Sequence, residues 1–251
     1  EFLMADYDNR VVRGAMAGVA SVDAGLRAHM LRVYNYMVGA LALTGVVAWA
    51  TANSPLMSVL YRQVATQGSV ALQPTIVGWV VLLAPLALVF FLGFRITQMS
   101  YSAAQATFWG YAALVGASLA SIFVAYTGAS IASTFFVTAA TFGVMSLWGY
   151  TTGRDLTGFG SFLGMGVIGL IIAMLVNMFF QSPAVNFMVS ILGVLIFTGL
   201  TAYDTQKIKN YYYAGDDGEM AGKKAIMGAL SLYLDFLNIF LFLLRFMGNR
   251  R

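Results

Sequence analysis

Two aspartates lie in parts of the chain where a charged side chain is hard to accommodate. Asp204 directly follows an apolar stretch at 184–203, and Asp235 lies near the middle of another at 226–246. An acid at the middle of a membrane-spanning helix costs about 2.5 to 3.5 kcal/mol, so each calls for a functional or structural explanation.

The chemistry of these residues depends on whether they meet. Two carboxyl groups brought together in a low-dielectric interior cannot both ionise cheaply, so the pair would share a proton near neutral pH. Deprotonated, it would repel itself and offer oxygen ligands suited to Ca²⁺. Protonated, it would form a hydrogen-bonded latch. Asp204 and Asp235 are therefore candidates for a pH sensor and gate, and for metal ligands toward calcium.

The segment around Asp235 carries further polar residues on one face. Ser231, Asp235, Asn238 and Arg245 fall at offsets of 0, 4, 7 and 14, which stacks them along one side of a helix. That stripe must avoid lipid, so we expect this helix in the interior of a bundle. Ser231 and Asn238, with Thr201 from the preceding stretch, are the predicted polar lining of an ion pathway.

Simpler interpretations exist for each acid. Asp204 stands three residues before Lys207 and could extend to the headgroups, and Asp235 could pair with an arginine of another helix. Arg95 is a candidate partner of the sensor, or a cytoplasmic anchor. Along their helices Asp235 lies about 16 Å from Lys224, but Asp204 only about 5 Å from Lys207. A pair therefore requires that the two helices be offset.

Composition indicates where these segments reside. Of 251 residues, 60% are hydrophobic and 10% charged, whereas a soluble domain carries about 25% charged residues. The surface must face lipid. The net charge of +4 does not indicate nucleic-acid binding, since the basic residues lie in loops and termini. The absence of Cys and the single His29 exclude Cys-ligated metals and paired-His zinc motifs. No cofactor is implied.

The predicted architecture is an all-α integral membrane protein with a seven-helix transmembrane bundle. We expect a cytoplasmic N-terminal segment at 1–32, a transmembrane domain at 33–246 and a short basic tail at 247–251. Small residues spaced four apart, as at Gly116 and Ala120 or Gly160 and Gly164, predict close helix packing. The apolar stretches are 33–52, 75–94, 107–127, 130–150, 161–181, 184–203 and 226–246.

Charge asymmetry predicts the orientation. Ten Lys and Arg residues fall on the side of the N-terminal segment, against Arg62 alone on the other side before the tail. Positive residues are retained in the cytoplasm, so the N-terminus is expected there. Arg245, Arg250 and Arg251 break this rule if the seventh stretch crosses fully. The sequence leaves open whether that stretch crosses or re-enters.

At these residues the chain resembles the transmembrane Bax inhibitor motif family, in its bacterial branch. The specific parts are Tyr203-Asp204 followed by Gln206-Lys207-Ile208, and the run from Ser231 to Phe246; Arg154-Asp155-Leu156 is weaker support. The resemblance covers essentially the whole chain.

The resemblance implies six helices around a central C-terminal helix and a pH-sensitive calcium leak in the bacterial inner membrane. Asp204 and Asp235 stand at the positions of the family's paired-aspartate sensor, and Arg95 is similar in placement to an arginine that interacts with it. The loop between the aspartates is several residues longer than in bacterial relatives. This difference leaves the implied fold unchanged, but cytoplasmic regulation as in the family does not follow from the resemblance.

Four functions are compared at this point. A passive, pH-gated calcium leak fits the interior acids, with calcium as the transported ion. A non-conducting regulatory protein that binds a membrane quality-control protease or another stress-response partner is the alternative. A proton-coupled transporter would show a coupled pH change. An intramembrane aspartyl protease would need Gly-x-Gly before its second acid, where Leu232, Tyr233 and Leu234 stand, so we expect no enzyme.

Overall fold

The computed structural model describes residues 2–66 and 69–249. The order of elements is α1 (Phe2–Ala52), α2 (Leu56–Leu60), β1 (Tyr61–Thr66), β2 (Ser69–Pro74), α3 (Ile76–Arg95), the 3-10 helix η1 (Ile96–Gln98), α4 (Tyr101–Ser118), α5 (Ala120–Ala125), α6 (Gly128–Thr151), α7 (Thr157–Phe180), α8 (Pro183–Asn210) and α9 (Gly218–Met247).

Seven segments of the described chain are long and apolar enough to span a membrane, which confirms the predicted seven-helix bundle. They are Ala24–Ala52, Ile76–Gln98, Tyr101–Ala125, Gly128–Thr151, Thr157–Phe180, Pro183–Asn210 and Gly218–Met247. The helices extend beyond the predicted apolar stretches, because a helix continues into its polar flanking turns while hydropathy marks only the part in lipid. The helix predicted to begin at 33 already runs from Phe2, so most of the predicted N-terminal segment is helical.

Hydroxyl and carboxyl side chains fix where the helices begin. Each accepts a hydrogen bond from a backbone N–H three residues later, which satisfies one of the donors left free at a helix start. These N-caps are Thr75 of α3, Ser100 of α4, Thr127 of α6, Ser182 of α8 and Asp217 of α9.

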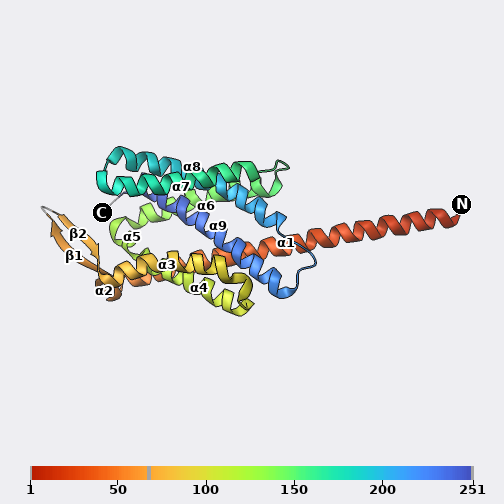
Figure 1. The fold of residues 1–251 in the computed structure, drawn as a ribbon, viewed down its shortest axis with the longest axis horizontal. Helices are drawn as coiled ribbons and strands as arrows, with labels where there is room; N and C mark the ends of the chain where they lie inside the picture. Colours follow the sequence, from red (N-terminus) through yellow and green to blue (C-terminus); the bar gives the residue numbers. More distant parts are fainter. Residues whose placement is uncertain (1, 67–68, 250–251) are drawn as a thin grey trace.

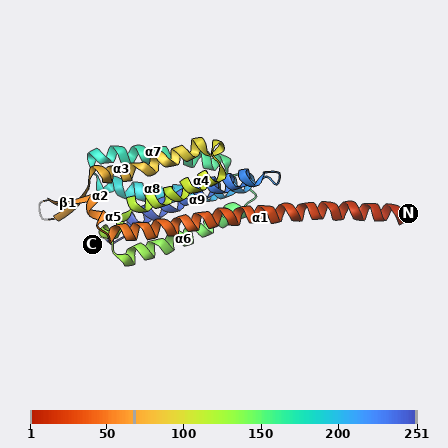
Figure 2. The same ribbon diagram turned by 90° about the horizontal axis from the view of Figure 1, so that it is seen from below.

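The C-terminal helix α9 occupies the centre, as predicted. Of its most apolar window, 67% is buried inside the protein, against 11% to 39% for the other six spans. It packs against α1, α4, α6 and α8, and Figures 1 and 2 show it running obliquely among them. Lipid contact is thereby left to the outer helices.

The end of α9 answers the question that the sequence left open. The backbone of Asn249 accepts from Thr127 N at 3.2 Å and donates to Ser130 Oγ at 3.0 Å. These residues begin α6, at the end of the bundle opposite the start of α9 (Figure 1). α9 therefore traverses the whole bundle, and the two chain ends lie at opposite ends of the molecule.

Small residues bring helices into close contact at two of the predicted places. A Cβ on Gly116 would lie 2.6 Å from the Thr44 carbonyl oxygen of α1, and one on Gly160 would lie 2.6 Å from Cδ1 of Tyr203 on α8. Gly164 has open space instead. Thr44 also binds α1 to its neighbours, donating to Ala112 O at 2.9 Å and lying 2.7 Å from the Tyr233 hydroxyl.

The long connection at 53–74 contains a feature that the sequence did not predict. Strands β1 and β2 pair antiparallel, with Tyr61 opposite Pro74 and Thr66 opposite Ser69. The hairpin projects from the end of the bundle that holds the C-terminus (Figure 1). It lies outside the apolar spans, so lipid does not oppose its open edges.

Candidate gating site

The two aspartates meet between α8 and α9. Their side chains lie close enough to act on each other electrostatically, and Asp235 is only 4% exposed. Since ionised carboxylates only accept, a hydrogen bond between them requires a proton on one. Asp235 Oδ2 is buried and has no hydrogen-bond partner among the described residues, and a proton shared with Asp204 would satisfy it.

The helix geometry explains how residues at different depths along their helices come together. α8 continues six residues past Asp204 to Asn210, and α9 begins seventeen residues before Asp235, at Gly218. α9 crosses the bundle at an angle to α8 (Figure 1). The offset that the pairing required is therefore met by the longer first half of α9 and by its tilt.

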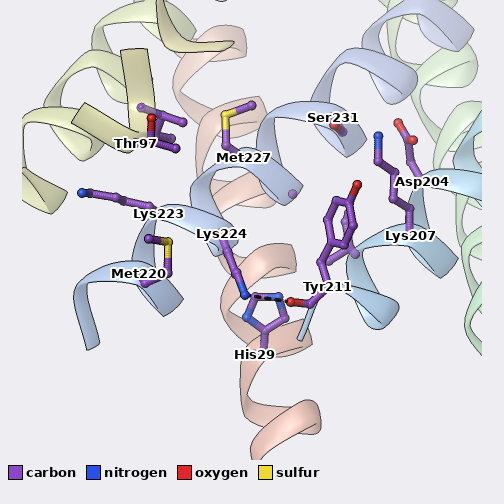
Figure 3. Close-up of a pocket in the computed structure, with 13 residues that line it drawn as sticks. His29, Thr97, Asp204, Lys207, Tyr211, Met220, Lys223, Lys224, Met227 and Ser231 are labelled. Atoms are coloured by element: carbon purple, nitrogen blue, oxygen red, sulfur yellow. Dashed lines mark hydrogen bonds between the residues drawn. The ribbon is translucent and has the colours of Figure 1, made fainter. Parts of the chain in front are cut away.

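A cavity of about 300 Å³ reaches Asp204 from one end of the bundle. Its walls come from α1, η1, α8 and α9, and three lysines line it: Lys207, Lys223 and Lys224. Figure 3 shows Lys207 extending beside Asp204, while the dashed line marks the bond from Lys224 Nζ to the Tyr211 carbonyl oxygen, 3.1 Å long. Asp204 thus has access to this cavity, whereas Asp235 is enclosed.

The centre of the bundle beyond the pair is apolar. Phe236, Ile239 and Phe242 of α9 are 5% exposed or less, and Phe236 packs against Phe142 with ring centroids 5.6 Å apart. These apolar side chains lie between the aspartates and the far end of α9.

Of the three residues predicted to line an ion pathway, one lines the cavity and two do not. Ser231 lines the cavity with Asp204. Thr201 is fully buried and donates to Phe197 O, and Asn238 donates to Leu234 O, so both bond to their own helices. Polar side chains in apolar helices commonly satisfy themselves in this way.

Arg95 does not join the aspartates in this structure. Its side chain is exposed at the end of α3 and donates to Gln98 Oε1 at 2.8 Å. The cavity wall is made by its neighbours Ile96 and Thr97 instead. Since the α3 helix ends at Arg95, the turn of η1 carries the chain past it and leaves the guanidinium outside.

Two acids alone make an incomplete calcium site. Among the described residues, no group of three His, Cys, Asp or Glu side chains is positioned to hold a metal ion. Calcium takes six to eight oxygen ligands. The pair could therefore contribute to a passing ion only together with water, hydroxyl or carbonyl oxygens.

Gln206 has a structural role that the sequence did not reveal. Its Oε1 accepts from Leu156 N at 2.8 Å and its Nε2 donates to Arg154 O at 2.7 Å. The glutamine thereby fixes the loop before α7 to the turn of α8 that carries Asp204. The two sequence runs that supported the family resemblance, around Asp155 and around Asp204, are thus joined in space.

A chain of hydroxyl groups forms a second link to the same turn. The Tyr34 hydroxyl lies 2.6 Å from Ser146 Oγ, which lies 3.0 Å from Thr205 Oγ1, and Thr205 donates to Thr201 O at 2.7 Å. Because Thr205 uses its proton on that carbonyl, Ser146 donates to Thr205 and Tyr34 to Ser146. The chain ties α1 and α6 to the residue next to Asp204, and no spacing in the sequence marks it.

Comparison with known proteins agrees with this architecture. The family described as "Inhibitor of apoptosis-promoting Bax1" matches residues 26–251. The chain is 49% identical to an uncharacterised protein of Rickettsia prowazekii over 91% of this chain and 92% of the relative. It is 47% identical to the inner membrane protein YbhL of Escherichia coli, over 91% and 94%. A Caulobacter vibrioides protein is 48% identical over 99% and 100%.

A seven-span helical bundle with a central acid-bearing helix defines the class as a multi-pass membrane protein. The match over nine-tenths of the chain makes it a member of the Bax inhibitor-1 family, as its resemblance implied.

Proposed function

We propose that this protein is a pH-sensitive calcium leak of a bacterial inner membrane, gated by Asp204 and Asp235. The single observation that carries the proposal is that two carboxyl groups face each other between α8 and the central helix, with Asp235 buried. Titratable groups inside a membrane bundle are costly and serve ion pathways or proton relays in most cases. The inner-membrane location follows the name of the Escherichia coli relative.

The proposed gate works through the shared proton. With one proton between them, the two side chains hold α8 against α9. Loss of that proton leaves two like charges in a low-dielectric site, which repel and favour separation of the helices. Separation would open a route past the apolar residues around Phe236 and present carboxylate oxygens to a calcium ion.

The end of the bundle with the cavity is proposed to be cytoplasmic. The ten Lys and Arg residues counted on that side lie in α1, in the loop before α7, or in the turns of α3, α8 and α9 at that end, and positive residues are retained in the cytoplasm. The N-terminus would be cytoplasmic and the C-terminus and hairpin on the opposite side.

Calcium flux into liposomes containing the purified protein tests the proposal. Flux should differ between acidic and neutral pH in the wild type, and Asp204→Asn and Asp235→Asn should each remove that difference, since the amide keeps the shape but cannot ionise. Asp155→Asn, an exposed acid outside the spans, is the matched control and should keep the response. Flux no greater than that of empty liposomes would overturn the leak.

A non-conducting regulatory protein is the second candidate. The backbone of α1 begins at Phe2 and continues beyond the bundle (Figure 2), and we propose this segment as the part that would bind a membrane protease or another stress-response partner. Absence of flux, together with capture of a partner that is lost when residues 2–20 are removed, would favour this function.

A further inference from the structure

The cavity beside Asp204 combines positive charge with an apolar wall. Lys207, Lys223 and Lys224 line it together with Ile96, Met220 and Met227. It lies at the end of α8, where the side chains of Lys207 and Lys209 mark the level of the headgroups. Cations over an apolar pocket at this depth are the complement of an anionic amphiphile.

The three lysines are not equally available. Lys223 pairs with Glu219 at 2.8 Å, and Lys224 pairs with Asp216 at 2.5 Å. Among the described side chains, those of residues 24–64 and 72–249, Lys207 has no ion-pair contact within 4 Å; it acts on Asp204 through space and lies over the rings of Tyr203 and Tyr211, 5.7 and 5.8 Å from their centroids. Lys207 is therefore the cation left to bind a ligand.

Two hydroxyl groups face the same space without a partner of their own. Neither the Tyr211 hydroxyl nor Ser231 Oγ makes a hydrogen bond to another described residue, and both residues line the cavity. Figure 3 draws both side chains in the lining of the cavity that also contains Lys207 and Asp204. One ammonium group and two hydroxyl donors can together hold a phosphate or carboxylate headgroup.

The size of the cavity restricts the apolar part of the ligand. About 300 Å³ is at the lower end of the range for small-molecule sites, which suits one acyl chain and not two. The methionines Met220 and Met227 give a wall that adapts to a flexible chain.

We propose that this cavity binds a single-chain lipid with an anionic headgroup, held by Lys207, Tyr211 and Ser231, with its chain against Ile96, Met220 and Met227. The site is independent of whether the protein conducts calcium. A bound headgroup would lie beside Asp204, which lines the cavity and is also part of the proposed gate.

Binding can be measured by native mass spectrometry of the purified full chain, with lauroyl-lysophosphatidate as the probe. We expect one bound molecule, displaced neither by lauroyl-lysophosphatidylcholine, which has the same chain, nor by inorganic phosphate, which has no chain. Lys207→Met should weaken binding about tenfold, the value of one charge-assisted hydrogen bond. Thr97→Trp, which fills the cavity from η1 without changing charge, should also weaken it.

Lys209→Met is the matched control. It removes the same charge two residues away, but Lys209 donates to Tyr150 O and does not line the cavity. An equal loss of affinity for lauroyl-lysophosphatidate in the two lysine variants would show that the lipid is attracted only by the surface charge, and would overturn the proposed site. Equal binding of the phosphocholine lipid, or full displacement by inorganic phosphate, would overturn the proposed ligand class.

Discussion

A close helix contact near the aspartate pair can be tested by adding one methyl group. Gly149 of α6 faces the backbone of α8, and a Cβ there would lie 2.7 Å from Ala202 Cα and 2.8 Å from its carbonyl carbon. Atoms of a helix backbone cannot rotate away as a side chain can. Gly149→Ala must therefore push α8 from α6 at a point two residues before Asp204.

The expected cost follows from known overpacking effects. Inserting a methyl group into a packed interface costs about 1 to 3 kcal/mol. For a chain of this length a loss of about 2 kcal/mol corresponds to a melting temperature lower by about 6 °C. Thermal unfolding of the purified protein, followed by the fluorescence of its four tryptophans, measures this directly.

Gly143→Ala provides the control on the same helix. A Cβ at Gly143 meets nothing within 4 Å, and alanine favours a helix over glycine, so this variant should melt at the wild-type temperature or slightly above. Equal melting temperatures for Gly149→Ala and Gly143→Ala would contradict the close approach of α6 to α8 beside Ala202.

Three further predictions concern the surroundings of the pair. Gln206→Leu leaves Leu156 N and Arg154 O without their partners and should cost about 1 to 3 kcal/mol in thermal unfolding; an unchanged melting temperature would contradict the role of Gln206. Hydrogen bonds from the Thr157 side chain and then its backbone N–H hold the pKa of Asp155 below its ordinary value of 3.8. That stabilisation is complete above the ordinary pKa and is lost as pH falls through the lowered pKa. Asp155→Asn should therefore reduce the fall of the melting temperature with decreasing pH. The same fall in both proteins would refute the prediction. Lys207→Gln removes a positive charge beside Asp204 and should raise calcium flux about threefold; lower flux would show that Lys207 does not oppose cation entry.

The membrane class, the seven spans and the central position of α9 could be predicted from the sequence. Each follows from a local pattern: apolar length, and a polar stripe on the helix that carries Asp235, which lipid would not tolerate. The proximity of Asp204 and Asp235 was supported by the family resemblance and not by spacing. The sequence of a single helix does not determine the angle at which it crosses another helix.

The remaining features depend on tertiary packing. The role of Gln206 requires that the loop before α7 lie against α8, and the chain from Tyr34 through Ser146 to Thr205 joins three helices distant in sequence. The exposed position of Arg95 follows from the turn of η1 that succeeds it. The hairpin at 61–74 was missed because hydropathy marks spans and gives little weight to a short polar connection.

The central helix is also the last of the seven along the chain. The six helices before it leave the ribosome and enter the bilayer first, so they must assemble around a gap that α9 later fills. Until then Thr44 has only its bond to Ala112 O and lacks Tyr233, and Asp204 lacks Asp235. Completion of the bundle and formation of the carboxyl pair are consequently one event in biogenesis, and a chain arrested before residue 218 would leave Asp204 without its partner, a state that membrane quality control can recognise.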